Sequence, residues 1–107
     1  MTEDRLSLKL QALADPTRRA MLAKLRQGKA TVNELAAPFD MSLPAISKHI
    51  KVLEKAGLIT RSRSAQQKPC QLSHDGLKEV DEWMKNYRDI WEDRLDRLES
   101  YLQSIKE

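Results

Sequence analysis

The sequence of 107 residues has a single cysteine, only three glycines and no stretch of 18 consecutive apolar residues. Cys70 therefore has no partner for a disulfide within the chain, which favours a reducing compartment. The glycines are too scattered for a phosphate-binding loop, and no nucleophile elbow or cluster of metal ligands accompanies them. The first residues also lack the basic start, apolar stretch and cleavage site of a secretory signal. These absences argue against an enzyme or a membrane protein, and we expect a cytoplasmic location.

The positive charge of the chain is concentrated in its middle. Residues 41–69 carry a net charge of +5 and residues 74–107 carry −4, within a total of +3. The composition, with 40% apolar and 33% charged residues, fits one small folded domain rather than a disordered tail. A compact basic region inside a nearly balanced chain indicates a localised binding site for a polyanion.

Leucine spacing and an aspartate–proline pair predict two helices at the start of the chain. Three leucines at i, i+4 and i+7 form one stripe of an amphipathic helix over residues 5–14. They are Leu6, Leu10 and Leu13. Asp15 and Pro16 are suited to the N-cap and first position of a second helix, which should run to about Gln27 and stop at Gly28.

Two further helices, joined by a short turn, are predicted next. Thr31 and Glu34 have the form of a capping box, which starts a third helix over residues 32–39. Ser42 is a good N-cap for a fourth helix that continues to position 56 and ends before Gly57. Only three residues would then separate the third helix from the fourth. The pair has the form of a helix-turn-helix.

Two segments after the fourth helix have strand-like composition and predict a small β-hairpin. They are residues 58–63 and 69–72, and the polar stretch between them, 64–68, predicts a mobile tip. Pro69 has no N–H to donate, so we expect it at the edge of the ladder or just outside it.

Ser73 is expected to cap a last helix that reaches Ile105, a length of roughly 45 Å at 1.5 Å per residue. Its apolar residues recur every seven positions and form a continuous seam. The seam comprises Leu77, Met84, Trp91, Leu98 and Ile105, widened by Val80, Tyr87, Leu95, Tyr101 and Leu102. One small body cannot cover a seam of this length, so we expect its first half to pack within the chain and its second half to pair with a second copy. The predicted dimer interface is Leu6, Leu10, Met84, Tyr87, Trp91, Leu95, Leu98 and Leu102.

The fourth predicted helix separates apolar residues from basic ones. At 100° per residue, Ile46, Ile50 and Leu53 share a face that would be buried. The opposite face carries Pro44, Lys48 and Lys51, with Ala45, Ser47, His49 and Val52 on its flanks. This pattern suits a helix in the major groove of B-DNA, with its first turns at the base edges and its lysines at the phosphates.

The hairpin would add cations beside this helix that could contact the sugar-phosphate backbone or the minor groove. The predicted DNA-binding residues are therefore Ser42, Pro44, Ala45, Ser47, Lys48, His49, Lys51, Arg61, Arg63 and Lys68. The alternative is a solvated basic face without a partner, which is the usual case for a run of charge. Turn length, helix polarity, hairpin and charge all agree, so we expect double-stranded DNA as the partner.

The stretches that combine these features are LADPTRRAMLAKLRQG, then TVNELAAPFDMSLPAISKHIKVLEKAGLI, and then the hairpin. Together they resemble the ArsR-type family of winged helix-turn-helix bacterial repressors over nearly the whole chain. The resemblance implies a mainly α fold with a β-hairpin wing over residues 58–72, a helix-turn-helix over 32–56, and a homodimer paired through residues 1–14 and 74–105. It also implies binding to an imperfect inverted repeat in a promoter, usually to repress transcription. By motif match, Ser47 and His49 fall where the family's recognition helix meets DNA.

Many members of the resembled family bind a metal ion that releases DNA. Thiolate sites in the third helix need a Cys-x-Cys pair, but this chain has Ala-Ala-Pro at residues 36–38. The last helix has one histidine, His74, near Asp75 and Glu79, and acidic residues at a helix start are ordinary partners of the helix dipole. We expect no metal and no cofactor.

Three alternatives remain open. Cys70 could be a redox switch if its thiolate were stabilised by Lys68, although a lone cysteine in a strand is more often a packing residue. Trp83, Tyr87 and Trp91 could line a small-molecule pocket between protomers, although aromatic residues at helical spacing are more often core. The long amphipathic helix could instead dock a different protein, which would make the chain a protein-interaction module.

Overall fold

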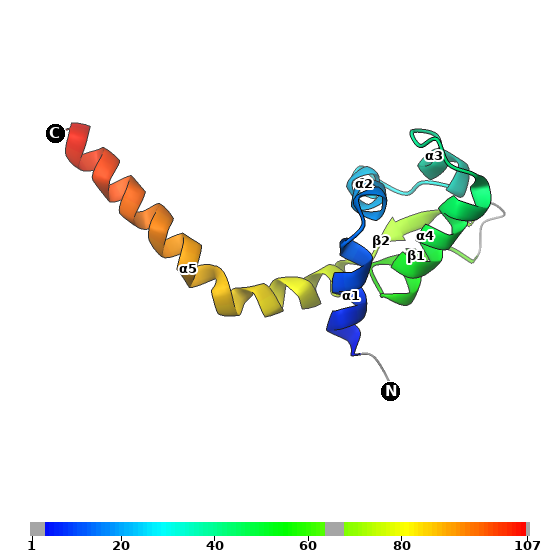
Figure 1. The fold of residues 1–107 in the computed structure, drawn as a ribbon, viewed down its shortest axis with the longest axis horizontal. Coiled ribbons are helices and arrows are strands. Elements are labelled where there is room, and N and C mark those ends of the chain that lie inside the picture. The colour runs from blue at the N-terminus through cyan, green and yellow to red at the C-terminus, as the bar shows by residue number, and fades with distance from the viewer. Residues whose placement is uncertain (1–3, 64–67, 107) are drawn as a thin grey trace.

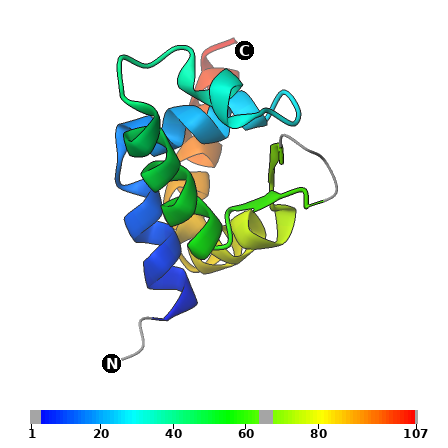
Figure 2. The same cartoon turned by 90° about the vertical axis from the view of Figure 1, so that its right-hand side faces the viewer.

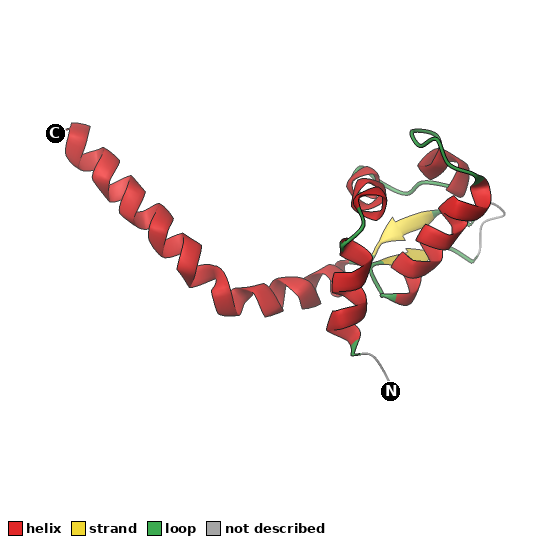
Figure 3. Ribbon diagram, viewed as in Figure 1, coloured by secondary structure: helices red, strands yellow, loops and turns green. Residues whose placement is uncertain are grey.

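The computed structural model describes residues 4–63 and 68–106 of the chain. The fold is mainly helical with one β-hairpin, as expected from the sequence (Figure 1; Figure 3). Its elements are α1 (Arg5–Leu13), α2 (Pro16–Leu25), α3 (Val32–Ala36), α4 (Leu43–Lys55), β1 (Ile59–Arg61), β2 (Cys70–Leu72) and α5 (His74–Lys106). The hairpin tip that was predicted to be mobile lies largely outside the described residues.

One hydrophobic core joins the first four helices to the hairpin. The predicted inner face of α4 is confirmed, because Ile46, Ile50 and Leu53 are at most 1% exposed. α1, α2 and β1 pack against α4, as Figure 2 shows for the helices. The other fully buried side chains with the largest volumes are Met21, Leu35, Leu58, Ile59 and Cys70. The buried back of α4 therefore holds its opposite face at the surface.

A third segment, at Ala30, pairs with the hairpin, and the sequence did not indicate this pairing. β1 and β2 pair antiparallel, with Arg61 opposite Cys70. On its other side, Cys70 exchanges two backbone hydrogen bonds with Ala30, of 2.7 and 3.0 Å. Pro69 lies just outside β2, as expected, and its carbonyl accepts from the Ser62 N–H at 3.0 Å. The bridge ties the wing to the connection between α2 and α3.

The third helix is shorter than predicted, because it ends at Ala36 rather than at position 39. Pro38 has no N–H to donate to the carbonyl of Glu34 four residues earlier. The Lys24 ammonium donates to that carbonyl instead, at 2.7 Å. The prediction of a three-residue turn is therefore wrong, and residues 37–42 connect α3 to α4.

The other helix ends differ from prediction by one or two residues. α1 ends at Leu13 and α4 at Lys55, each followed by an alanine as C-cap. α2 ends at Leu25 instead of Gln27, because the chain tightens into a turn in which the Gly28 N–H donates to the Leu25 carbonyl. Gly28 and Gly57 both have positive φ, as expected for the residues that stop these helices.

The buried line of α1 is not its leucine stripe. Lys9 and Ala12 are the buried residues of this helix, and Leu10 is 39% exposed. Lys9 can be buried because its ammonium pairs with the Glu79 carboxylate of α5 at 3.1 Å. Arg5 of α1 pairs with the same carboxylate. Of the three leucines in the stripe, Leu13 packs on the core and Leu6 is half-buried, so Leu10 is the one that remains available for a second surface.

α5 begins inside the body and then leaves it (Figure 1). The Ser73 hydroxyl accepts from the Gly76 N–H at 3.3 Å, which confirms the predicted cap. Gly76 lies so close to the preceding turn that an added Cβ would fall 1.8 Å from the Gly57 carbonyl oxygen. Leu77 packs on the core, whereas every described residue from 89 onward is exposed. In the described part of the chain, no helix combines the length and apolar character needed to cross a membrane.

Candidate nucleic-acid interface

The start of α4 is set by a side-chain cap. The Ser42 hydroxyl accepts from the Ala45 N–H at 3.3 Å, and Pro44 lies in the first turn, where its missing N–H costs nothing. Ser42 and Pro44 are both exposed. The N-terminal end of α4, with its free N–H groups and positive dipole end, therefore opens to solvent.

The exposed face of α4 is the one that the sequence predicted. Pro44, Lys48 and Lys51 are exposed, and Ala45 and Ser47 are half-buried on its flanks. Neither lysine forms an ion pair with the part of the chain that the structure describes. A cationic face with small residues at its N-terminal end is thus presented on a helix whose back is rigidly packed.

His49 lies on the flank of α4 that faces α2. Its Nδ1 is 3.2 Å from the Arg18 guanidinium and 4.0 Å from the Asp15 carboxylate, and its side chain is 20% exposed. The imidazole therefore contacts side chains of α2, beside the lysine face rather than within it. Contact of His49 with DNA stays a prediction.

The two arginines of the ADPTRR stretch close the C-terminal end of α1. Arg18 donates from Nε to the Ala12 carbonyl at 2.7 Å and from the guanidinium to the Gln11 carbonyl at 3.1 Å. Arg19 donates to the Leu13 carbonyl at 2.7 Å. The Ala12 and Leu13 carbonyls have no i+4 partner within the helix, so these contacts satisfy them, whereas the Gln11 carbonyl also accepts from the Ala14 N–H at 3.2 Å.

Asp15 completes this junction as the N-cap of α2. Its carboxylate accepts from the Arg18 N–H at 3.0 Å. This backbone hydrogen bond, with the charges of Arg18 and His49, lowers the pKa of the Asp15 carboxyl below its ordinary value, despite the opposing effect of desolvation. The carboxylate form is thus favoured where α1, α2 and α4 meet.

The wing presents two of its three predicted cations openly. Arg63 and Lys68 are exposed, whereas Arg61 is half-buried instead of projecting from the hairpin. The Arg61 Nε is buried and has no hydrogen-bond partner among the described residues. These three residues line a hollow of about 380 Å³ beside Glu54 of α4. The structure therefore brings the wing cations together next to α4.

Cys70 is fully buried between the wing and the Ala30 bridge. Burial raises the pKa of its thiol, and the neighbouring charge of Arg61 offsets this only in part. A redox-sensing cysteine needs an accessible thiolate. The position of Cys70 therefore favours the packing interpretation.

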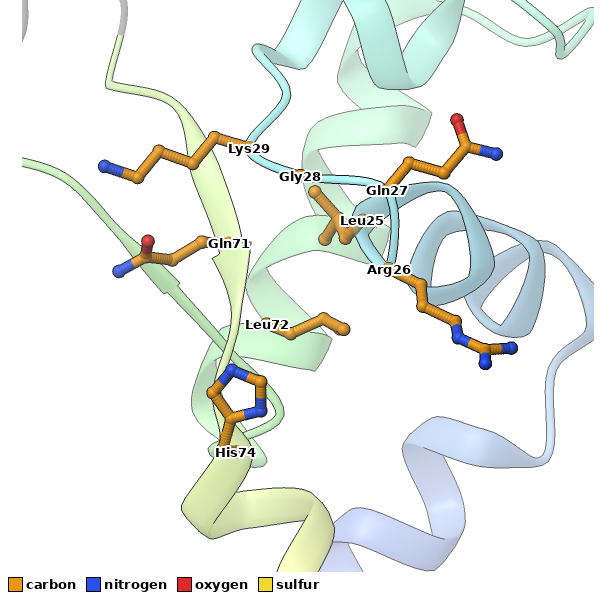
Figure 4. A pocket seen from close by; sticks show the side chains of 8 residues that line it. All are labelled: Leu25, Arg26, Gln27, Gly28, Lys29, Gln71, Leu72 and His74. Atoms are coloured by element: carbon orange, nitrogen blue, oxygen red, sulfur yellow. The ribbon is translucent and has the colours of Figure 1, made fainter.

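A second hollow, of about 260 Å³, lies between the end of α2 and β2 (Figure 4). Leu25 and Leu72 line its inner side, while Lys29, Gln27 and Arg26 point outward in different directions. A small-molecule site needs polar groups that converge on the ligand, and these side chains diverge. No group of three or more His, Cys, Asp or Glu within the described ranges is placed to hold a metal ion. The absence of a metal stays a prediction.

The predicted dimer residues lie on α1 and along α5. Leu6 and Met84 are half-buried, and the others are exposed, namely Leu10, Tyr87, Trp91, Leu95, Leu98 and Leu102. Trp83 and Tyr87 form a tilted ring contact with centroids 5.4 Å apart. The structure thus confirms that the outer half of the seam is uncovered in the single chain, and pairing stays a proposal.

Sequence reasoning missed the polar residues that hold the helices together. Lys9 and Glu79 are far apart in the sequence, and no spacing signal connects them. For Arg18 and Arg19 the sequence offered one local signal, namely their position in the first turn of α2, which begins three residues after α1 ends. Their reach back to the carbonyls of α1 depends on the angle between two helices, which the sequence did not provide.

The helix-turn-helix of α3 and α4, the adjoining hairpin and the exposed cationic face define a winged helix-turn-helix protein of the DNA-binding class. Residues 13–62 match the family model of a helix-turn-helix domain. The chain is 35% identical over 77 residues to the transcriptional repressor SdpR of Bacillus subtilis, in an alignment that covers 72% of this chain and 86% of SdpR. It is 43% identical over 67 residues to the HTH-type transcriptional regulator Rv2034 of Mycobacterium tuberculosis. This alignment covers 63% of this chain and 63% of Rv2034, so the chain matches less than two thirds of that relative.

Solved structures agree with these relatives. The crystal structure of one ArsR family transcriptional regulator is 43% identical, covers 83% of this chain and 98% of its own, and superposes with a TM-score of 0.75. The homodimeric winged helix-turn-helix DNA-binding domain of a possible ArsR-family regulator from Mycobacterium bovis, at 22% identity, shares the fold with a TM-score of 0.64, covering 80% of this chain and 81% of that one. The chain belongs to the ArsR family of transcriptional regulators, so the resemblance noted in the sequence is confirmed.

Proposed function

We propose that this protein is a homodimeric transcriptional repressor that binds an inverted-repeat site in promoter DNA. The observation that carries the proposal is the division of α4 into a buried back, Ile46 with Ile50 and Leu53, and an exposed face that bears Lys48 and Lys51. The major groove of B-DNA is wide enough for one such helix. The packed back would keep the helix rigid while its face enters the groove.

The residues of α4 divide into two roles in this proposal. The exposed N-terminal end, with Ser42, Pro44, Ala45 and the flanking Ser47, would lie nearest the base edges, where hydrogen bonds and apolar contacts read sequence. Lys48 and Lys51, whose ammonium groups form no ion pair among residues 4–63 and 68–106, would contact phosphates. His49 would lie beside the reading face.

The wing would contact the backbone or minor groove through its exposed cations. Arg63 and Lys68 are the accessible pair, and half-buried Arg61 would support them from the hollow beside α4. Phosphate contacts add affinity for every sequence alike. The wing would therefore strengthen binding more than it selects a site.

A second copy would supply the other half of the interface. The exposed seam of α5 and the homodimeric state named for the Mycobacterium bovis domain both support this step. In a symmetric dimer the two α4 helices would enter successive major grooves, about 34 Å apart. A cytoplasmic location, where bacterial promoter DNA is accessible, is part of the proposal.

Selection of bound duplexes from a random DNA pool tests this function. We expect a symmetric consensus, and we expect affinity for it to fall by roughly 10³- to 10⁵-fold between 50 and 200 mM salt if six to ten phosphates are contacted. Lys48→Ala with Lys51→Ala should weaken binding strongly, whereas Lys78→Ala, an exposed lysine of α5, should not. No enrichment of any duplex by the parent protein would refute the proposal.

A further inference from the structure

One side chain of α2 connects α1, a helix of the proposed dimer interface, to α4, the proposed recognition helix. Arg18 of α2 donates to the Ala12 and Gln11 carbonyls at the end of α1, at 2.7 and 3.1 Å. Its remaining terminal nitrogen lies 3.2 Å from Nδ1 of His49 in α4. Figure 2 shows the three helices side by side at this end of the molecule. A single guanidinium from α2 therefore contacts α1 and α4 at once.

The chemistry of this junction requires an arginine. A guanidinium holds its five N–H donors in a planar fork, so it can serve two carbonyls and an imidazole from one fixed orientation. A lysine has the same charge but only one nitrogen, which cannot reach all three partners together. The C-terminal end of α1 also carries the negative end of the helix dipole, which favours a cation here.

The histidine side of the junction is held from two directions. The Asp15 carboxylate lies 4.0 Å from the same His49 nitrogen and accepts the Arg18 backbone N–H. His49 follows Lys48 in α4, so its imidazole lies on the flank next to the exposed face that bears Lys48 and Lys51. Any rotation of α4 about its axis would change the contact between His49 and Arg18.

We propose that Arg18 is a positioning residue for DNA recognition, which sets the orientation of α4 relative to α1 through its contact with His49. This inference rests on the proposed function. In the dimer, the orientation of each recognition helix relative to its own α1 decides whether both reading faces meet the two half-sites together. Arg18 would therefore act on selectivity for the operator, and not on the general attraction to DNA.

Arg19 provides a matched control within the same stretch. It also caps the end of α1, through the Leu13 carbonyl, and it is exposed and forms no side-chain hydrogen bond or ion pair with α4. Arg18→Lys and Arg19→Lys both keep the charge and both remove a guanidinium cap from α1. Only the first of them breaks the connection to His49.

The experiment compares dissociation constants for the duplex that the parent selects and for a scrambled duplex of equal length. For Arg18→Lys we expect the ratio of scrambled to selected constants to fall about tenfold, within the range that one good base contact supplies. Binding to the scrambled duplex should stay within about twofold, because the charge is kept. Arg19→Lys should leave the ratio within about twofold, and sedimentation should show the same assembly for all three proteins.

His49→Ala then tests the route. If Arg18 acts through His49, His49→Ala alone should lower the ratio by a similar factor, and the double variant should lose no more than Arg18→Lys alone. A further loss in the double variant would overturn the route through His49, because the two residues would then act independently. Equal losses for Arg18→Lys and Arg19→Lys would overturn the inference, because capping of α1 alone would then explain them. A parent that prefers no duplex would refute the proposed function as well, which is a different result from a selective parent with an unchanged Arg18→Lys variant.

Discussion

Carboxylates cap or brace the starts of three helices. Asp4 and Asp15 accept backbone hydrogen bonds as N-caps of α1 and α2, and Glu34 accepts from the Thr31 N–H in the capping box of α3. These backbone hydrogen bonds lower the pKa of all three carboxyls below their ordinary values. A carboxyl with a lowered pKa in the folded state stabilises the fold above its unfolded pKa and loses that contribution as the pH falls through its folded pKa.

Replacement of Asp15 by asparagine tests this pH dependence. Asparagine is also a good N-cap, so Asp15→Asn should fold at pH 7, but it has no carboxyl to titrate. The parent should lose stability as the pH falls below about 4, since the unfolded pKa is near 3.8, and the variant should lose less. Urea unfolding between pH 7 and pH 2 measures the difference. Asp40→Asn, at an exposed aspartate outside any cap, should follow the parent, and identical curves for all three proteins would contradict the role of Asp15.

Gly76 tests the close approach of α5 to the turn after α4. A Cβ at this position would lie 1.8 Å from the Gly57 carbonyl oxygen, which is backbone and cannot move aside cheaply. Gly76→Ala should therefore destabilise the fold by about 1–3 kcal/mol or more, the usual cost of overpacking. Lys78→Ala, on the exposed side of the same helix, should change stability by less than about 0.5 kcal/mol. Equal midpoints in urea for the two variants would show that the approach is looser than described.

At the scale of the elements, local signals predicted most of the starts correctly. Ser42, Thr31 with Glu34, and Ser73 cap their helices as expected, because a cap depends on residues only three positions apart. The buried face of α4 also followed from spacing alone. The early end of the third helix was missed although Pro38, which has no N–H for the Glu34 carbonyl, is visible in the sequence. The Lys24 ammonium that donates to this carbonyl comes from α2, and no local spacing indicates that contact.

Contacts between elements could not be predicted in this way. The bridge between Ala30 and Cys70, the ion pair of Lys9 with Glu79 and the reach of Arg18 to His49 each join segments far apart in the chain. The spacing of residues within one helix or strand gives no information on which distant segments will meet. For the same reason, the half-buried position of Arg61 differs from the prediction that it projects from the hairpin.

Replacement of Arg63 tests whether the wing contacts the DNA backbone. Arg63→Ala removes an exposed cation that would contact the DNA backbone, so it should weaken binding to selected and scrambled duplexes by similar factors. The slope of log affinity against log salt should become less negative by about one, which corresponds to one phosphate contact. Glu54→Gln, at the rim of the same hollow, serves as a control that leaves the cations intact. A loss confined to the selected duplex would mean that Arg63 reads bases instead.

At the scale of the whole molecule, α5 is the feature that a single chain does not explain. Its outer half presents large apolar side chains that are 40–63% exposed, from Trp91 to Tyr101 and Leu102, and makes the protein 61 Å long. Exposed apolar surface of this extent marks an interaction site. A second copy is the proposed partner, and a different protein is the rival.

A charge within the seam distinguishes these partners. Leu95→Glu should weaken self-association at least tenfold, because it would bring two carboxylates into an apolar interface. Ser100→Glu is the matched control, since position 100 lies about 180° from the Trp91 line of the helix and is also exposed. Sedimentation equilibrium of the parent should show a dimer that Leu95→Glu alone disrupts. A parent that sediments as a monomer and pairs only with another polypeptide would support the protein-interaction module.

In the proposed complex, the exposed face of α4 enters successive major grooves of one duplex, once from each protomer. A Ser47→Cys variant that carries an iron chelate tests this placement most directly, because Cys70 is fully buried and the unlabelled parent serves as the control. We expect two symmetric patches of DNA cleavage centred about one helical turn apart. Cleavage no stronger than that from the same chelate at Ser100→Cys, or a single patch on a duplex fully bound by dimer, would contradict it.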